Sequence, residues 1–203
     1  MRRRRAVAGG RAPRHADPMK RLLGAMAVGI AFALLQLAVF AVAQWPFPAM
    51  STVLMHVFAF LDFGSAWAVV GIVGGGMMPR LRGSIVAGAL TLLAMVCSYC
   101  GVAWLSTPGM RSSAFPVVFW SSAALLGGPV LGAVGALGRR RDAWSLVAWI
   151  GGPLLVVIET GRQMVVGDEP GYVPLHIAAW MLVAVGAGIS VRRVRATARV
   201  ASP

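Results

Sequence analysis

Long apolar runs alternate with short basic segments along this chain, and the runs are long enough to cross a membrane. About 20 helical residues, at a rise of 1.5 Å each, span a hydrocarbon core of about 30 Å. Only helices and closed barrels satisfy their backbone hydrogen bonds in lipid. We therefore expect an all-α, polytopic membrane protein. The apolar runs predict six transmembrane helices, at about 22–43, 53–78, 83–104, 114–138, 143–160 and 173–190.

The basic residues between the runs predict how the bundle is oriented. If the N-terminus is cytoplasmic, 17 of the 19 Lys and Arg residues fall in cytoplasmic segments, and only Arg111 and Arg162 fall outside. Positive charge is retained on the cytoplasmic side of a membrane. The pattern therefore predicts a multi-pass protein of the bacterial cytoplasmic membrane with both termini in the cytoplasm.

Both ends of the chain have the composition of basic tails. The first residues are mostly Arg, Ala, Gly and Pro without helical periodicity, which is typical of disorder. Either Met1 or Met19 is the translation start. Residues 41–43 resemble a signal-cleavage site, but the preceding apolar run exceeds the 7 to 15 residues of a signal peptide, so we expect the first helix to be retained. The expected division is a cytoplasmic tail at 1–19, a transmembrane domain at 20–191 and a second cytoplasmic tail at 192–203.

Composition and net charge support this interpretation. The chain has 203 residues, of which 58% are hydrophobic and 12% charged, and its formal net charge is +13. A soluble domain carries roughly 25% charged residues, so a soluble fold is excluded. A single strongly basic patch would indicate nucleic acid binding, but these charges follow the inner loops and tails. We expect the lipid bilayer, and not nucleic acid, as their partner.

Small residues are frequent within the apolar runs, and Gly alone occurs 25 times. Ala25, Gly29 and Ala33 share one face of the first helix because they are spaced four residues apart. Small residues at such spacing let helices in lipid approach closely. This face predicts either packing inside the bundle or docking of a partner membrane protein.

Two Gly-Gly-Pro segments interrupt the fourth and fifth runs. Gly128 and Pro129 belong to the first segment, and Gly152 and Pro153 to the second. Both segments lie nine or ten residues from the turn that joins the two runs, at a depth of roughly 15 Å. Paired interruptions of this kind indicate binding sites in transporters. The alternative is that both are kinks required for packing.

A few ionisable residues lie within or beside the apolar runs. Asp62 falls about ten residues into the second run, where a carboxylate costs about 2.5 to 3.5 kcal/mol. Glu159 and Arg162 have the spacing of a helical ion pair, and His176 lies at a similar depth toward the outer face. We expect these four residues to contribute to a small-molecule site or, alternatively, to structural pairing.

The two cysteines, Cys97 and Cys100, form a C-x-x-C sequence in the third run. Such a pair can act in thiol redox chemistry when its thiols are accessible and acidic. No second pair is present to relay electrons, and two cysteines in an apolar helix also serve as small packing residues.

Enzyme signatures are missing from the chain. It contains no H-E-x-x-H, G-x-S-x-G or Walker sequence. Its three His and six acidic residues are scattered over both sides of the predicted bundle. We therefore expect no enzymatic activity, no catalytic residues, no metal and no cofactor.

With the segment Asp62–Trp67 opening the second run, the region from Lys20 to Arg195 resembles small six-helix integral membrane proteins of unknown function common in actinobacteria. In size, topology and its small-residue first helix it is also similar to the substrate-binding S-components of energy-coupling-factor transporters. Neither resemblance implies a reaction. Three functions remain open: a non-enzymatic component that binds or transports an unknown small solute, a ligand-free assembly subunit of a membrane complex, and a thiol redox protein using Cys97 and Cys100.

Overall fold

The computed structural model describes residues 17–62, 64–106 and 114–140, together with single positions between 151 and 192. All the regular elements within the three continuous ranges are α-helices, which confirms the all-α prediction there. The helices are α1 (Pro18–Ala43), α2 (Pro48–Leu61), α3 (Gly64–Gly76), α4 (Leu81–Ser106) and α5 (Phe115–Leu137).

The starts of the helices follow from local chemistry. Asp17 precedes α1, and its carboxylate accepts a hydrogen bond from the backbone N–H of Met19 at 2.9 Å. This bond satisfies one of the N–H groups that have no intrahelical acceptor. Pro18 occupies the first turn of α1 and Pro116 that of α5, where proline's missing N–H costs nothing.

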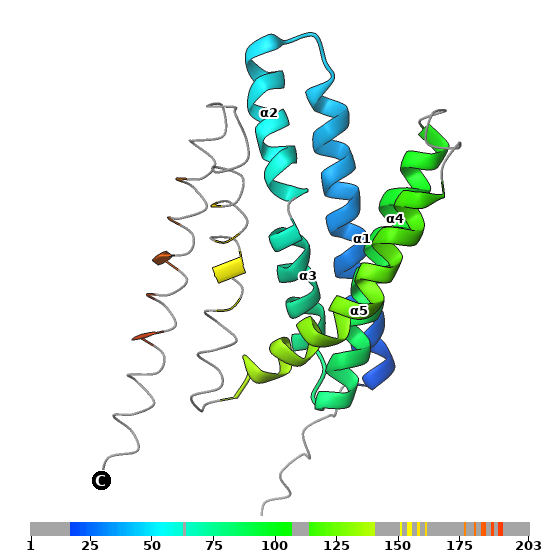
Figure 1. Ribbon diagram of the computed structural model, residues 1–203, viewed down its shortest axis with the longest axis vertical. Coiled ribbons are helices and arrows are strands. Elements are labelled where there is room, and N and C mark those ends of the chain that lie inside the picture. The colour runs from blue at the N-terminus through cyan, green and yellow to red at the C-terminus, as the bar shows by residue number, and fades with distance from the viewer. Residues whose placement is uncertain are drawn as a thin grey trace, which may run out of the picture.

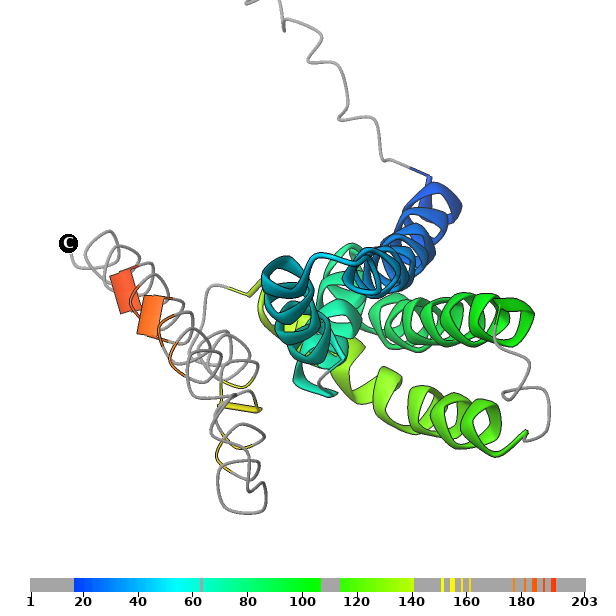
Figure 2. The same ribbon diagram turned by 90° about the horizontal axis from the view of Figure 1, so that it is seen from above.

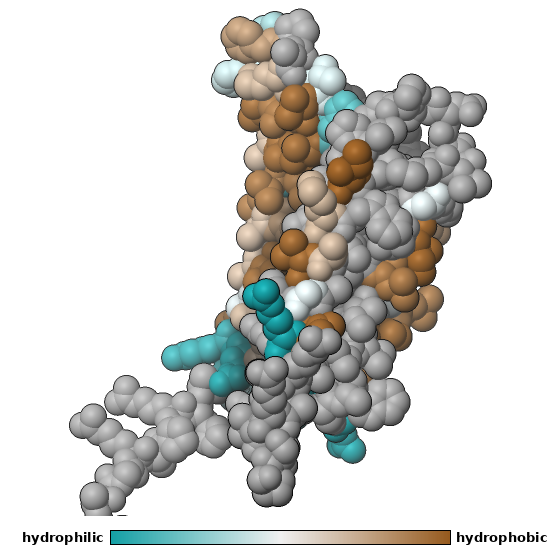
Figure 3. All heavy atoms as spheres, turned by 90° about the vertical axis from the view of Figure 1, so that its left-hand side faces the viewer, coloured by the Kyte–Doolittle hydropathy of each residue, from teal (hydrophilic) through white to brown (hydrophobic). Residues whose placement is uncertain are grey.

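Three helices, α1, α4 and α5, are each long and apolar enough to cross a membrane. The pair α2 and α3 forms a fourth span if its two halves are counted together. Large apolar side chains are exposed along these helices, as expected where they face lipid. Figure 3 shows apolar side chains over much of one face and hydrophilic ones gathered near one end. The chain is therefore an integral membrane protein.

The predicted span at 53–78 is not one straight helix. The structure divides this stretch into α2 and α3, which are bent by 56° relative to each other. Asp62 caps the end of α2, and its backbone N–H still bonds to the Phe58 carbonyl at 2.9 Å. Asp and Gly are both poor helix formers, so Asp62 and Gly64 weaken the helix where it breaks.

The count of six spans finds no support within the described ranges, which contain five helices and at most four spans. The predicted spans 22–43, 83–104 and 114–138 correspond to α1, α4 and α5. The remaining two predicted spans, 143–160 and 173–190, lie outside the continuous described ranges.

Helix α4 lies at the centre of the described bundle. It packs against α1, α3 and α5, while α3 also packs against α5, and Figures 1 and 2 show this arrangement from two directions. A buried cluster joins the four helices. Its members are Ala33, Trp67, Val70, Leu92, Met95, Val96 and Ala124.

Glycines line the contact between α3, α4 and α5. A Cβ on Gly88 would overlap the backbone of Gly128 and Gly132, and one on Gly75 would overlap Gly132. Backbone contacts between these helices therefore require glycine at these positions. Close backbone approach is a main source of helix association in lipid, and it fixes α5 against the other two helices.

Candidate functional site

The break between α2 and α3 lies far from either end of the bundle along its length, and its residues Asp62 and Gly64 are exposed. Helix α3 has 13 residues. By helical rise, its first residue therefore lies roughly 20 Å from its last residue, at the end that leads into the basic loop before α4. That depth falls inside a hydrocarbon core of about 30 Å. Helix ends leave N–H and C=O groups without intrahelical partners, and at this depth such groups must bond to protein or to water in a cavity.

Gln36 of α1 is the polar side chain that reaches this break. It is 0% exposed, and its Nε2 donates a hydrogen bond of 2.7 Å to the Leu61 carbonyl at the end of α2. Its Oε1 is buried, and in the part of the chain that the structure describes it has no hydrogen-bond partner. The amide therefore satisfies one backbone group of the break and retains an unused acceptor.

Aromatic side chains lie beside the break. Trp67, in the first turn of α3, is 8% exposed, and among the described residues its Nε1 has no hydrogen-bond partner. Its ring lies edge-on to Tyr99 of α4, with ring centres 6.2 Å apart, and 5.0 Å from the ring of Trp120 on α5. Ala33, one turn from Gln36, packs in the same buried cluster as Trp67. The amide and the aromatic rings thus belong to one region.

Asp62 adds a carboxylate to this region. It lies in the break itself and is exposed. Asp62, a candidate from the sequence, directly follows Leu61, whose carbonyl accepts the Gln36 hydrogen bond, so it lies at the same break as the buried amide. We name Gln36, Leu61, Asp62, Trp67 and Tyr99 the break site.

The break site is rich in hydrogen-bond acceptors. The Gln36 Oε1, the Asp62 carboxylate and the carbonyl end of α2 all supply negative charge or partial charge. Aromatic faces attract cations through their negative quadrupole. The acceptors therefore suit an ammonium or another N–H group of a solute, while the Trp67 Nε1–H and the N–H groups at the start of α3 are donors for an acceptor on the same solute.

The first Gly-Gly-Pro segment lies elsewhere, in the contact between α4 and α5. Gly128 is buried, and a Cβ on it would overlap the backbone of Ala89. Pro129 lies inside α5, which continues to Leu137 and changes direction along its length (Figure 1). These positions favour a kink for packing. The other candidates, Gly152, Pro153, Glu159, Arg162 and His176, lie outside the described residues.

The small-residue face of α1 is covered by α4. Ala25, Gly29 and Ala33 are all buried, and a Cβ on Gly29 would overlap the Thr91 carbonyl. This placement agrees with the packing alternative. The same face continues to Gln36, three residues beyond Ala33, which the sequence pattern did not indicate as a functional residue. What marks Gln36 in the sequence is that it is a single amide residue on the small-residue face of an apolar run without charged residues.

Both cysteines lie on α4 close to the break site. Cys97 is exposed and Cys100 half-buried, and both thiols are free. Cys100 packs against the cluster that contains Trp67. Cys100 therefore contributes to the wall of this region, whereas Cys97 is exposed.

Comparison with known proteins gives a family without a known activity. The model of DUF6518, a family of unknown function, matches residues 56–202, well over half of the chain. The match takes in the break, α3, α4 and α5 and begins after α1. No curated protein and no solved structure matches the chain.

Proposed function

We propose that this chain, which belongs to the DUF6518 family, is a non-enzymatic membrane component that binds a small polar solute at the break site and takes part in its transport. The observation that carries the proposal is the buried Gln36 Oε1 beside a broken span. A buried acceptor without a partner costs roughly 1–3 kcal/mol. A solute that donates a hydrogen bond there recovers this free energy.

Broken helices at mid-depth are a recurring feature of transporter binding sites. They offer backbone carbonyls and N–H groups that a continuous helix uses internally. In this chain the ends of α2 and α3 meet at such a break, and Asp62, which caps the end of α2, adds a carboxylate there. The small-residue first helix, which resembles that of energy-coupling-factor S-components, fits the same proposal.

The chemistry of the break site indicates the class of solute. The break site holds acceptors on Gln36, Leu61 and Asp62, together with the paired rings of Trp67 and Tyr99. Carboxylate and aromatic groups together favour cations. We infer a solute with an ammonium or another N–H-rich group.

We also propose how many times the chain crosses the membrane and on which side its termini lie. We place the termini in the cytoplasm and count six spans, with 143–160 and 173–190 completing the bundle. Gly152 and Pro153 would then line the middle of the solute path, and Glu159, Arg162 and His176 its outer part. The positive-inside pattern of the whole sequence supports this arrangement.

Untargeted mass spectrometry of the purified chain tests the proposal. The full chain in mild detergent is denatured, and the released small molecules are compared between wild type, Asp62→Asn and Asp17→Asn. We expect a cationic or N–H-rich compound that Asp62→Asn loses at least tenfold. Asp17→Asn, which removes an exposed charge but keeps a capping side chain, should retain it. A stoichiometric membrane partner with no small molecule would instead support an assembly subunit.

A further inference from the structure

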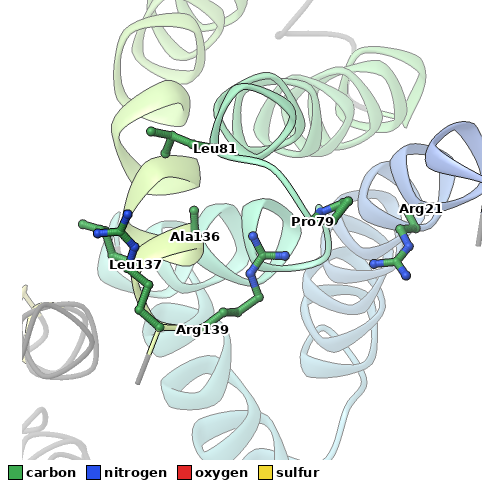
Figure 4. Close-up of a pocket in the computed structure, with 7 residues that line it drawn as sticks. Arg21, Pro79, Leu81, Ala136, Leu137 and Arg139 are labelled. Atoms are coloured by element: carbon green, nitrogen blue, oxygen red, sulfur yellow. The ribbon is translucent and has the colours of Figure 1, made fainter. Parts of the chain in front are cut away.

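A basic pocket lies at the end of the bundle opposite the loop that joins α1 to α2. It has a volume of about 510 Å³. Figure 4 shows Arg21 on the α1 side and Arg139 with Leu137 on the α5 side. Three arginines line it, namely Arg21, Arg139 and Arg140, together with apolar side chains that include Leu81, Ala136 and Leu137. The pocket is separate from the break site, which lies roughly 20 Å farther into the bundle by the rise of α3.

Two of the arginines are held in place by neutral groups. Arg21 donates from Nη1 to the Met77 carbonyl at 3.3 Å, and Arg139 donates from Nη2 to the Ser84 Oγ at 3.3 Å. A guanidinium has five N–H donors, so each of these bonds leaves most of them available. The bonds orient the two groups without neutralising their charge.

Positive charge accumulates at this pocket. Partial burial and, after it, the like charge of Arg21 lower the pKa of Arg139, so the two guanidinium groups repel each other. An anion between the arginines would relieve this repulsion and accept several charge-assisted hydrogen bonds.

We propose that this pocket binds the phosphate of an anionic phospholipid, between Arg21 and Arg139. Basic pockets between membrane helices are suited to lipid headgroups. Helices α1, α4 and α5, which are apolar enough to span a membrane, begin or end here, so the pocket lies at headgroup depth. Leu81 lines it and is 52% exposed, so an acyl chain passes from the pocket onto the apolar outer surface.

Thermal unfolding of the purified full chain in neutral detergent tests this site. Three additions are compared: phosphatidylglycerol, phosphatidylcholine and inorganic phosphate. We expect a saturable rise in the unfolding midpoint with phosphatidylglycerol only. An equal rise with phosphatidylcholine, or no rise with any lipid, overturns the proposal. A rise with inorganic phosphate that equals the lipid's would assign the site to a free anion and overturn the lipid source.

Two variants locate the effect. Arg139→Gln should raise the concentration of phosphatidylglycerol at half-saturation by roughly tenfold, the equivalent of one charge-assisted hydrogen bond. Arg82→Gln removes an exposed charge from the same end of α4 without touching the pocket, and it should leave half-saturation unchanged. Equal losses in both variants would show diffuse attraction and overturn the site. If Arg139→Gln fails to fold, Arg21→Gln provides the same comparison.

Discussion

Neighbouring glycines on α5 have different surroundings, and the difference shows what holds this bundle together. A Cβ on Gly128 would overlap Ala89 of α4, whereas a Cβ on Gly127 would meet nothing within 4 Å. The sequence presents the two residues side by side in one Gly-Gly-Pro segment. Only the packing of α4 and α5 distinguishes the glycine that a backbone contact requires from the one that it does not.

Gly128→Ala should therefore destabilise the protein by about 1–3 kcal/mol, because the added methyl group forces α4 and α5 apart. Gly127→Ala is the matched control and should be neutral or slightly stabilising, since Ala is the better helix former. Denaturation of the purified variants in mixed micelles measures both changes. Equal stabilities would contradict the backbone contact at Gly128.

Asp62 was predictable from the sequence as a residue of interest, because a carboxylate within an apolar run is costly. Gln36 was not, since a neutral amide gives a much weaker signal than a charge. Its importance depends on where α2 ends, and Leu61 and Gln36 are 25 residues apart in the chain. Long-range placement of this kind is a property of packing and cannot be obtained from a local pattern.

At the scale of the helices, the apolar runs predicted α1, α4 and α5 well, because length and hydropathy set where a span begins and ends. They did not predict that the run at 53–78 divides into α2 and α3. The run is apolar on both sides of Asp62, so hydropathy alone favours one helix. The break depends on partners such as Gln36 that stabilise the freed backbone.

Gln36→Leu tests this dependence. Loss of the amide leaves the Leu61 carbonyl without its donor inside the bundle, and we expect about 1–2 kcal/mol of destabilisation. Gln44→Leu makes the same substitution at the exposed end of α1. No hydrogen bond from a side-chain amide to a helix break is lost there, so stability should change by less than about 0.5 kcal/mol. Denaturation of the two variants side by side distinguishes them. Equal effects would mean that the amide does not support the break.

At the scale of the whole molecule, the packing of the helices brings basic residues to one end of the described bundle, as the charge pattern along the chain predicts. The loop between α3 and α4 and the end of α5 come together with the start of α1, so Arg21, Arg80, Arg82, Arg139 and Arg140 belong to one end of the described bundle. The sequence predicted this grouping from the positive-inside rule. It did not predict that the arginines enclose a pocket, because a pocket depends on how three helix ends meet.

Labelling of single cysteines tests the orientation. In a Cys97→Ser, Cys100→Ser background, Arg82→Cys and Ser106→Cys place a thiol at opposite ends of α4. A membrane-impermeant thiol reagent should label Ser106→Cys in intact cells and Arg82→Cys only after permeabilisation. The reverse order would place the basic end outside.

If a solute binds at the break between α2 and α3, the break is a polar site within the membrane that water reaches. Hydrogen exchange of the full chain in lipid nanodiscs, followed by mass spectrometry, tests it most directly. Amides at 64–67 should exchange at least a hundredfold faster than those at 91–96 of α4, which lie at a similar depth by helical rise. Equal protection of the two segments would mean that the break is dry, and it would contradict a solute site there.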